Sequence, residues 1–379
     1  MENDILYRII EWTDFIVFFL FFCSVGYLLI FSVSSLKNQK IVYRKTQKQH
    51  RFLVIFTACE IDIRIHDSID AFLKQTYPKS NFDLVIISKI ISESARCDLE
   101  NDPVILMKSP ENQHFRAEMI ESAINEMDSN YDEIVIMKHG NTVEPNFLEE
   151  VNKAFYAGGM ALQTHRILNN PRTNTGILNA ISEEINNSIF RRGHVRLGFS
   201  SGLNGSGMVF NYAWFKKHIG RIKQTSLTKE LEALLLRQGI FIQYLENVYT
   251  YDQRPGSISE FNKQRHDWYT AKRFTLKDAA KDFPKALMAG NFDYCDKIIQ
   301  WMMPSKFILL FLICIIAFIL IIVEWSLSVK WFLLLILLLL VFDLATPAKL
   351  RNLRSIFALV AFPVLFLSTL VNTLRIRIR

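Results

Sequence analysis

Apolar segments at both ends of the chain limit its fold more than any other feature. One covers residues 15–31 without a charged side chain, and three more cover residues 307–323, 331–344 and 356–374. An α-helix rises 1.5 Å per residue, so about 20 apolar residues can cross the hydrocarbon layer of a bilayer. We therefore expect a multi-pass membrane protein with one large domain of mixed composition between the spans.

The charges next to the first segment predict its orientation. Six Lys and Arg residues lie between residues 37 and 51, directly after the segment, whereas Glu2, Asp4 and Glu11 precede it. Acidic residues at the amino terminus argue against a cleavable signal peptide. Because basic loops stay on the cytoplasmic side, we expect the amino terminus outside and the large domain in the cytoplasm, at the cell inner membrane. The basic run also suits membrane lipid as a partner, and it does not indicate nucleic-acid binding.

The far end of the chain fits this orientation with one exception. Lys349, Arg351 and Arg354 lie between the last two apolar segments and are expected in the cytoplasm. Three crossings would then leave the basic tail outside, against the same rule. Three alternatives follow: the last segment is re-entrant, it is interfacial, or the charge of the tail is tolerated on the outer side. The five cysteines have neither metal-site nor disulfide spacing, which fits a reducing cytoplasm.

The middle of the chain has an alternating α/β pattern. Apolar runs of strand length at 52–58, 83–88, 103–109 and 133–141 alternate with helical patterns at 66–78 and 115–127. This order predicts βαβ units and a mainly parallel sheet flanked by helices. Ligands of such sheets bind at the carboxyl ends of the strands, so the residues after each strand are the first candidates for a site.

Two further helical patterns complete the domain plan. Residues 228–240 form a helical pattern ended by Gly239, and residues 284–304 are amphipathic and lead directly into an apolar segment. The expected units are a transmembrane segment at 1–36, a basic linker at 37–51, a cytoplasmic domain at 52–282, an interfacial helix at 283–304 and transmembrane helices at 305–379.

Several short motifs appear in a characteristic order. They are QTYP at 75–78, EPNFLEEV at 144–151, ALQTHR at 161–166, GSGM at 205–208 and GNFDYCDKIIQWMMP at 290–304. Together they resemble membrane-bound family-2 glycosyltransferases over most of residues 52–304. The resemblance implies a GT-A fold and, in active members, inverting transfer of sugar from a nucleotide sugar with Mg²⁺ or Mn²⁺.

The nucleotide-binding and metal-binding positions of that family carry other residues here. An Asp after the second strand normally holds the nucleotide base, and its place falls near Ser88 or Lys89. An Asp-x-Asp turn after the fourth strand normally holds the metal, and its place is taken by Lys138, His139 and Gly140. A lysine can offset phosphate charge but cannot bind a divalent cation. We therefore expect no metal site and no cofactor, and a solvated rather than metal-bound His139.

The general base of the family also has no counterpart. Its Asp falls on Thr228, with Glu230 and Glu232 displaced along the same helix. A shift of two residues turns a side chain by about 200° around a helix, and a shift of four moves it a full turn along the axis. Neither glutamate is expected to reach the same acceptor, and a neutral threonine is a poor base.

A Gln-x-x-Arg-Trp motif near the membrane is only partly kept. Gln264 and Trp268 match, Arg265 lies between them, and Asp267 replaces the arginine that would face the diphosphate. The expected ligand or acceptor cleft therefore contains Lys138, Gly205, Ser206, Gly207, Gln264, Arg265 and Trp268, with no residue expected to be catalytic.

These substitutions predict a pseudo-glycosyltransferase that keeps the scaffold and has lost the reaction. Its expected partner is an active glycosyltransferase or a polysaccharide-synthesis subunit, and a nucleotide sugar remains a candidate ligand. The alternative is an active, metal-independent transferase with Lys138 as phosphate partner and Glu230 or Glu232 as base. A transporter is less favoured, because the spans contain few polar residues that could line a path.

Overall fold

A computed structural model describes most of the chain. The described residues are 2–37, 43, 44, 46–99, 102–110, 116–127, 130–169, 173–222, 227–252, 258–361, 363, 367 and 371. Within these ranges the side chains of 2–7, 59, 94–96, 258–271, 274 and 361 lie outside the description.

An eight-stranded sheet organises the described part of the large domain, in the order β3-β2-β1-β4-β7-β6-β8-β5. The strands β1 to β4 are mutually parallel, β6 is parallel to β8, and β7 and β5 pair antiparallel to their neighbours. This confirms the predicted mainly parallel α/β sheet. The strands are β1 (Phe52–Glu60), β2 (Phe82–Ile90), β3 (Ile105–Lys108), β4 (Glu133–Lys138), β5 (Asn141–Val143), β6 (Ala161–Leu168), β7 (Met208–Asn211) and β8 (Ile242–Asp252).

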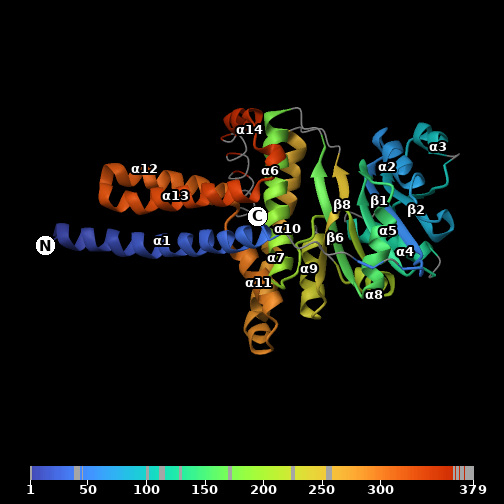
Figure 1. Cartoon of the computed structure of the whole chain (residues 1–379), viewed down its shortest axis with the longest axis horizontal. Helices are drawn as coiled ribbons and strands as arrows, with labels where there is room; N and C mark the ends of the chain where they lie inside the picture. The colour runs from blue at the N-terminus through green and yellow to red at the C-terminus, as the bar shows by residue number, and fades with distance from the viewer. Residues whose placement is uncertain are drawn as a thin grey trace.

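Helices cover both faces of this sheet (Figure 1). They are α2 (Arg64–Leu73), α3 (Glu93–Leu99), α4 (Arg116–Glu126), α5 (Phe147–Tyr156), α6 (Asn174–Asn187), α7 (His194–Arg196), α8 (Tyr212–Ile219) and α9 (Leu227–Arg237). A π-helical turn, Ser188–Gly193, joins α6 to α7, and a 3₁₀ turn, Lys79–Asn81, precedes β2.

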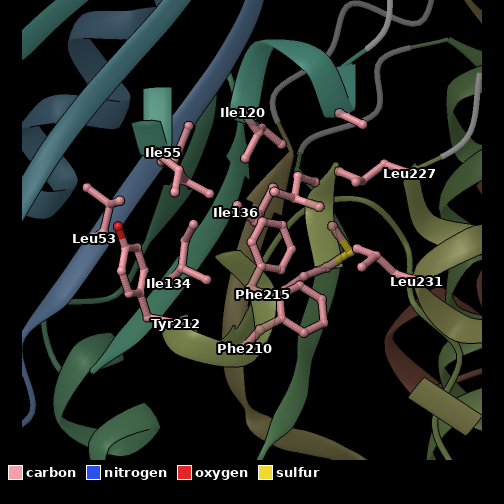
Figure 2. Packing of buried hydrophobic residues seen from close by; sticks show 14 of the residues in the cluster. Leu53, Ile55, Ile120, Ile134, Ile136, Phe210, Tyr212, Phe215, Leu227 and Leu231 are labelled. Atoms are coloured by element: carbon pink, nitrogen blue, oxygen red, sulfur yellow. The ribbon is translucent and has the colours of Figure 1, made fainter. Parts of the chain in front are cut away.

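Successive side chains of each strand point to opposite faces of the sheet, so the core forms two layers, one on each face. Leu53 and Ile55 of β1 point to the layer of α4, α8 and α9, whereas the neighbouring Val54 packs into the layer of α2 and α5. Figure 2 shows the first layer, where Leu227 and Leu231 of α9 lie near Phe210 and Phe215. Because Leu227 and Leu231 are four residues apart, they share the face of α9 that covers the sheet.

Three described helices are long and apolar enough to cross a membrane: α1 (Glu2–Ser35), α12 (Lys306–Val323) and α13 (Trp325–Ala345). They contain three of the four predicted spans and project together away from the sheet (Figure 1). Apolar side chains such as Leu28, Ile313 and Leu338 bind them to each other. Their outer faces expose large apolar residues, as lipid-facing helices do.

The fourth predicted span, residues 356–374, is described only at its start. Helix α14 (Leu353–Ala358) and the 3₁₀ turn Leu359–Ala361 follow the turn Ala348–Leu350. Ala358 packs against Ile177 and Leu178 of α6. Most of the residues after 361 lie outside the described part, so this span stays a prediction.

The segment expected to form one interfacial helix, residues 283–304, has a break. It comprises the end of α10 (Ile258–Met288), a turn in which Gly290 has a φ of 71°, and α11 (Phe292–Met302). The predicted domain boundary at residue 282 therefore falls inside α10. The two helices pack against each other and against α9 (Figure 1).

Candidate functional site

Three of the predicted site residues meet at the carboxyl end of β4. Lys138 is the last residue of β4, and Thr228 lies in the first turn of α9. A Cβ atom built on Gly205 would lie 3.4 Å from both Lys138 Nζ and Thr228 Cγ2. The positions at which the resemblance predicts the metal turn and the base, Lys138 and Thr228, are therefore neighbours in space, although 90 residues of chain separate them.

The glycine loop at 204–207 is fixed by hydrogen bonds from three sides. The Ser206 hydroxyl accepts from the Lys138 amide at 3.1 Å and donates to Asn141 Oδ1 at 2.7 Å. The Gln163 amide donates to the Ser206 carbonyl at 3.0 Å. Gly207 has a φ of 62°, and a Cβ there would collide with Thr164 Oγ1. The loop therefore needs glycine for both its conformation and its packing.

Arg116 is a site residue that the sequence analysis missed. Its Nε donates to Thr57 Oγ1 at 2.7 Å, its Nη2 donates to the Met137 carbonyl at 2.9 Å, and its Nη1 donates to the Gly205 carbonyl. One guanidinium thus joins β1, β4 and the glycine loop. Its three acceptors lie 59, 21 and 89 residues away in the chain, so no local sequence pattern identified it.

His139 is paired with a carboxylate, so the expectation of a solvated side chain was wrong. Its Nε2 lies 2.7 Å from Asp62 Oδ1, and Asp62 also accepts from Arg64 Nε at 3.1 Å. Burial alone would raise the pKa of Asp62, but the hydrogen bonds from Arg64 and His139 outweigh it and lower the pKa to about 2. Asp62 follows β1, so the topology of the sheet brings it beside the turn after β4.

Gly140 completes this turn. It has a φ of 76°, which favours glycine, and its Cβ position lies 3.4 Å from Arg64 Cβ. Among the described residues, no group of three or more His, Cys, Asp or Glu side chains is arranged to hold a metal ion.

Glu232, one of the two alternative bases, anchors the glycine loop instead. Its side chain is fully buried, and Oε1 accepts from the Leu203 amide at 2.6 Å. Its Oε2 accepts from Lys229 Nζ at 2.5 Å. Burial lowers the pKa of Lys229, and the Glu232 carboxylate opposes that shift. Glu230, half-buried two residues earlier, is left as the base candidate of the catalytic alternative.

The predicted nucleotide-base position lies at the ends of β2 and β3. Ser88 is buried, its hydroxyl donates to the Ile90 carbonyl at 2.9 Å, and its carbonyl accepts from the Ser109 amide at 2.8 Å. Lys89 lines a surface depression of about 400 Å³ there. The described lining residues are Lys89, Ile90, Ile91, Lys108, Ser109 and Pro110.

The remaining cleft residues are described only as backbone. Gln264, Arg265 and Trp268 lie in α10, and their side chains are outside the described part of the chain. Their predicted place in the cleft stays a prediction.

This arrangement of strands has counterparts among solved structures. A mannosyltransferase, PcManGT from Pyrobaculum calidifontis in complex with GDP-Man and Mn²⁺, superposes with a TM-score of 0.52 at 12% identity, covering 85% of this chain and 98% of that chain. The fold is GT-A-like. S. aureus TarS 1-349 gives a TM-score of 0.43 at 13% identity, covering 86% of this chain and 90% of that one. At such identities the similarity concerns the fold alone. No protein-family model and no curated protein sequence matches the chain.

Proposed function

We propose that this chain is a membrane-bound, GT-A-like protein that has lost sugar transfer and acts as a partner in cell-surface glycan or polysaccharide synthesis. The observation that carries the proposal is the group formed by Lys138, Gly205 and Thr228. An ammonium group and a hydroxyl stand where the resemblance implies metal-binding carboxylates and a general base.

The chemistry of sugar transfer explains why these two changes matter. A divalent cation on the diphosphate needs oxygen ligands and stabilises the leaving group. Loss of a general base alone typically slows such a reaction by about 10² to 10⁴-fold. Two carboxylates near this position are already paired: the partly exposed Asp62 with Arg64 and His139, and the buried Glu232 with Lys229.

The scaffold around this position supports a binding role. Arg116, Gln163 and Glu232 hold the glycine loop from three different elements. Such a preorganised loop is suited to contact a ligand or a protein surface without a reaction. We place the large domain on the cytoplasmic side of the inner membrane, because of the basic run after the first span. The proposed protein partner is an active glycosyltransferase or another polysaccharide-synthesis subunit.

One observation favours the catalytic alternative. The Lys138 ammonium lies beside Gly205 at the ligand end of the sheet, where it could offset the charge of a diphosphate without a metal. In that case Glu230 is the candidate base, because Glu232 is committed to Lys229 and the Leu203 amide.

Calorimetry on the detergent-purified full chain separates the two proposals. UDP, GDP and their sugar conjugates are titrated with Mg²⁺, with Mn²⁺ and with a chelator, and release of the nucleoside diphosphate is measured in parallel. The proposal expects no release in any condition. Transfer that persists in the chelator and disappears in Lys138→Ala would establish the alternative. Metal-dependent binding would contradict both proposals.

A further inference from the structure

The π-helical turn Ser188–Gly193 lies between the long apolar helices and the segment that leads to the glycine loop. It continues α6 and runs into α7, so the helix passes without a break from Asn174 to Arg196. Turns of this kind are rare and occur mostly as short interruptions of α-helices, often at functional positions. The Ile189 side chain of the turn is fully buried in the apolar core formed by α1, α12 and α13. The turn is therefore packed directly against the part of the chain that is suited to cross a membrane.

Two of these apolar helices hold the turn through their backbones. The Ser188 hydroxyl donates to the Ala345 carbonyl, at the end of α13, at 2.7 Å. Helix α1 packs against the turn, and a Cβ atom built on Gly193 would collide with the Phe31 carbonyl oxygen. Glycine permits this close approach of two backbones because it has no side chain. A movement of α1 or α13 relative to the large domain would therefore act directly on the turn.

The turn also holds the segment that leads into the glycine loop. The Phe190 carbonyl accepts from the Gly202 amide at 3.0 Å. The Arg191 side chain is buried, and its Nε donates to the Gly202 carbonyl at 3.1 Å. Both backbone groups of Gly202 are thus bound to the turn, and the amide of the next residue, Leu203, is bound to Glu232. The position of the turn therefore helps to decide where the glycine loop begins.

The π geometry of the turn makes the contact with Gly202 possible. In a regular α-helix the His194 amide would bond to the Phe190 carbonyl, four residues earlier. Here that amide bonds to the Arg191 carbonyl instead, which leaves the Phe190 carbonyl for Gly202. The fully buried side chain of His194 supports this geometry, because its Nδ1 donates to the Ile189 carbonyl at 2.6 Å. A change of the turn toward α-helical geometry would take the Phe190 carbonyl away from Gly202.

We infer that the turn Ser188–Gly193 couples the position of α1 and α13 to the order of the glycine loop. In its π form the turn binds Gly202 and keeps the start of the loop in place. A displacement of α1 or α13 disturbs that form and releases the start of the loop. The coupling goes beyond the proposed function, because it concerns how the loop is controlled and requires neither a ligand nor sugar transfer.

The test measures hydrogen exchange in residues 200–207 of the full chain in lipid nanodiscs. Ser188→Ala removes the bond to α13 and neither of the bonds to Gly202. Exchange in this segment should become about fivefold faster, as expected for the loss of one hydrogen bond that supports it. The matched control is Ser32→Ala. This serine is also buried and donates to an α13 carbonyl, that of Val341 at 3.2 Å, but its bond joins α13 to α1 rather than to the turn.

A second pair of variants acts on the contact with α1. Gly193→Ala should force the turn away from Phe31 and speed exchange in residues 200–207 by about tenfold or more. Gly26→Ala, within α1 itself, is the control, because no described atom lies within 4 Å of that Cβ position. Exchange in α2 should stay unchanged in all four variants. The inference is overturned if Ser188→Ala and Ser32→Ala exchange at equal rates in residues 200–207, or if exchange rises uniformly across the large domain. If Gly193→Ala does not fold, the serine pair decides the result. No nucleotide sugar is present, so the result is independent of transferase activity.

Discussion

Glu232 Oε1 accepts a hydrogen bond from the backbone amide of Leu203 at 2.6 Å, inside the protein and away from solvent. This contact joins helix α9 to the segment that leads into the glycine loop. The other carboxylate oxygen accepts from Lys229. The acidic side chain that lies near the expected base position is thus used to position the loop, which leaves it unsuited to accept a proton from a substrate.

Glu232→Gln should destabilise the fold. The amide keeps the shape and can still accept from Leu203, but the Lys229 ammonium loses its buried counter-charge. Removing one partner of a buried ion pair typically costs about 3–5 kcal/mol. Thermal melting of the purified protein measures the loss. Glu230→Gln, half-buried on the same helix, is the control, and an equal effect of the two variants would contradict this role for Glu232.

Gly207→Ala should destabilise the fold by more than the backbone strain of an alanine at positive φ alone. The added Cβ would meet the hydroxyls of Thr164 and Thr250, and the φ of 62° is strained for alanine. Gly198→Ala is a matched control, because its φ is 85° but nothing lies within 4 Å of its Cβ position. We expect about 1 kcal/mol for Gly198→Ala and a larger loss for Gly207→Ala. Similar melting temperatures would show that the loop adapts to a side chain.

Arg116→Met should loosen the glycine loop without removing the α4 helix. The variant keeps much of the apolar stem but loses the donors to Thr57, Met137 and Gly205. Hydrogen exchange should become faster in residues 204–207 and remain unchanged in α2. Arg221→Met, which changes an exposed arginine after α8, is the control. Unchanged exchange in the loop would mean that Ser206 and Gln163 hold it by themselves.

The ionised Asp62 carboxylate, held by Arg64 and His139, should contribute stability that is lost in acid. The pKa of Asp62 is about 2 in the folded chain, below its ordinary value of 3.8, so the folded state favours the ionised carboxylate. The contribution is therefore present above pH 3.8 and is lost as the pH falls toward 2. Asp62 is more than a third exposed, so screening reduces the gain to about 1 kcal/mol or less. Asp62→Asn should lower the melting temperature at pH 7 and reduce its dependence on pH between 4 and 2. An unchanged pH dependence would argue against this assignment.

The proposed orientation predicts which engineered cysteines react from outside the cell. Ser326→Cys lies at the start of α13, beside the turn after α12, and should be labelled by a membrane-impermeant maleimide on intact cells. Lys74→Cys, an exposed position after α2 in the large domain, should react only after lysis. Both variants need a background in which the chain's own cysteines are replaced. The opposite pattern would invert the topology.

The sequence by itself determined the elements of this protein that depend on local patterns. Long apolar runs predicted α1, α12 and α13, because a membrane helix needs only length and hydrophobicity. The alternation of short apolar runs with helical patterns predicted the parallel part of the sheet, because periods of 2 and 3.6 residues reflect one-sided burial. The order of short motifs led to the GT-A-like fold, which the superposition on PcManGT supports.

Only the tertiary structure decided how the site is built. The contacts of Arg116 with Gly205, of Asp62 with His139, and of Glu232 with Leu203 join residues that are far apart in the chain. A hydrogen bond requires two groups within about 3 Å and in the right direction. Sequence periodicity gives the face of an element but not that distance, so these pairings emerge only when the elements are packed together.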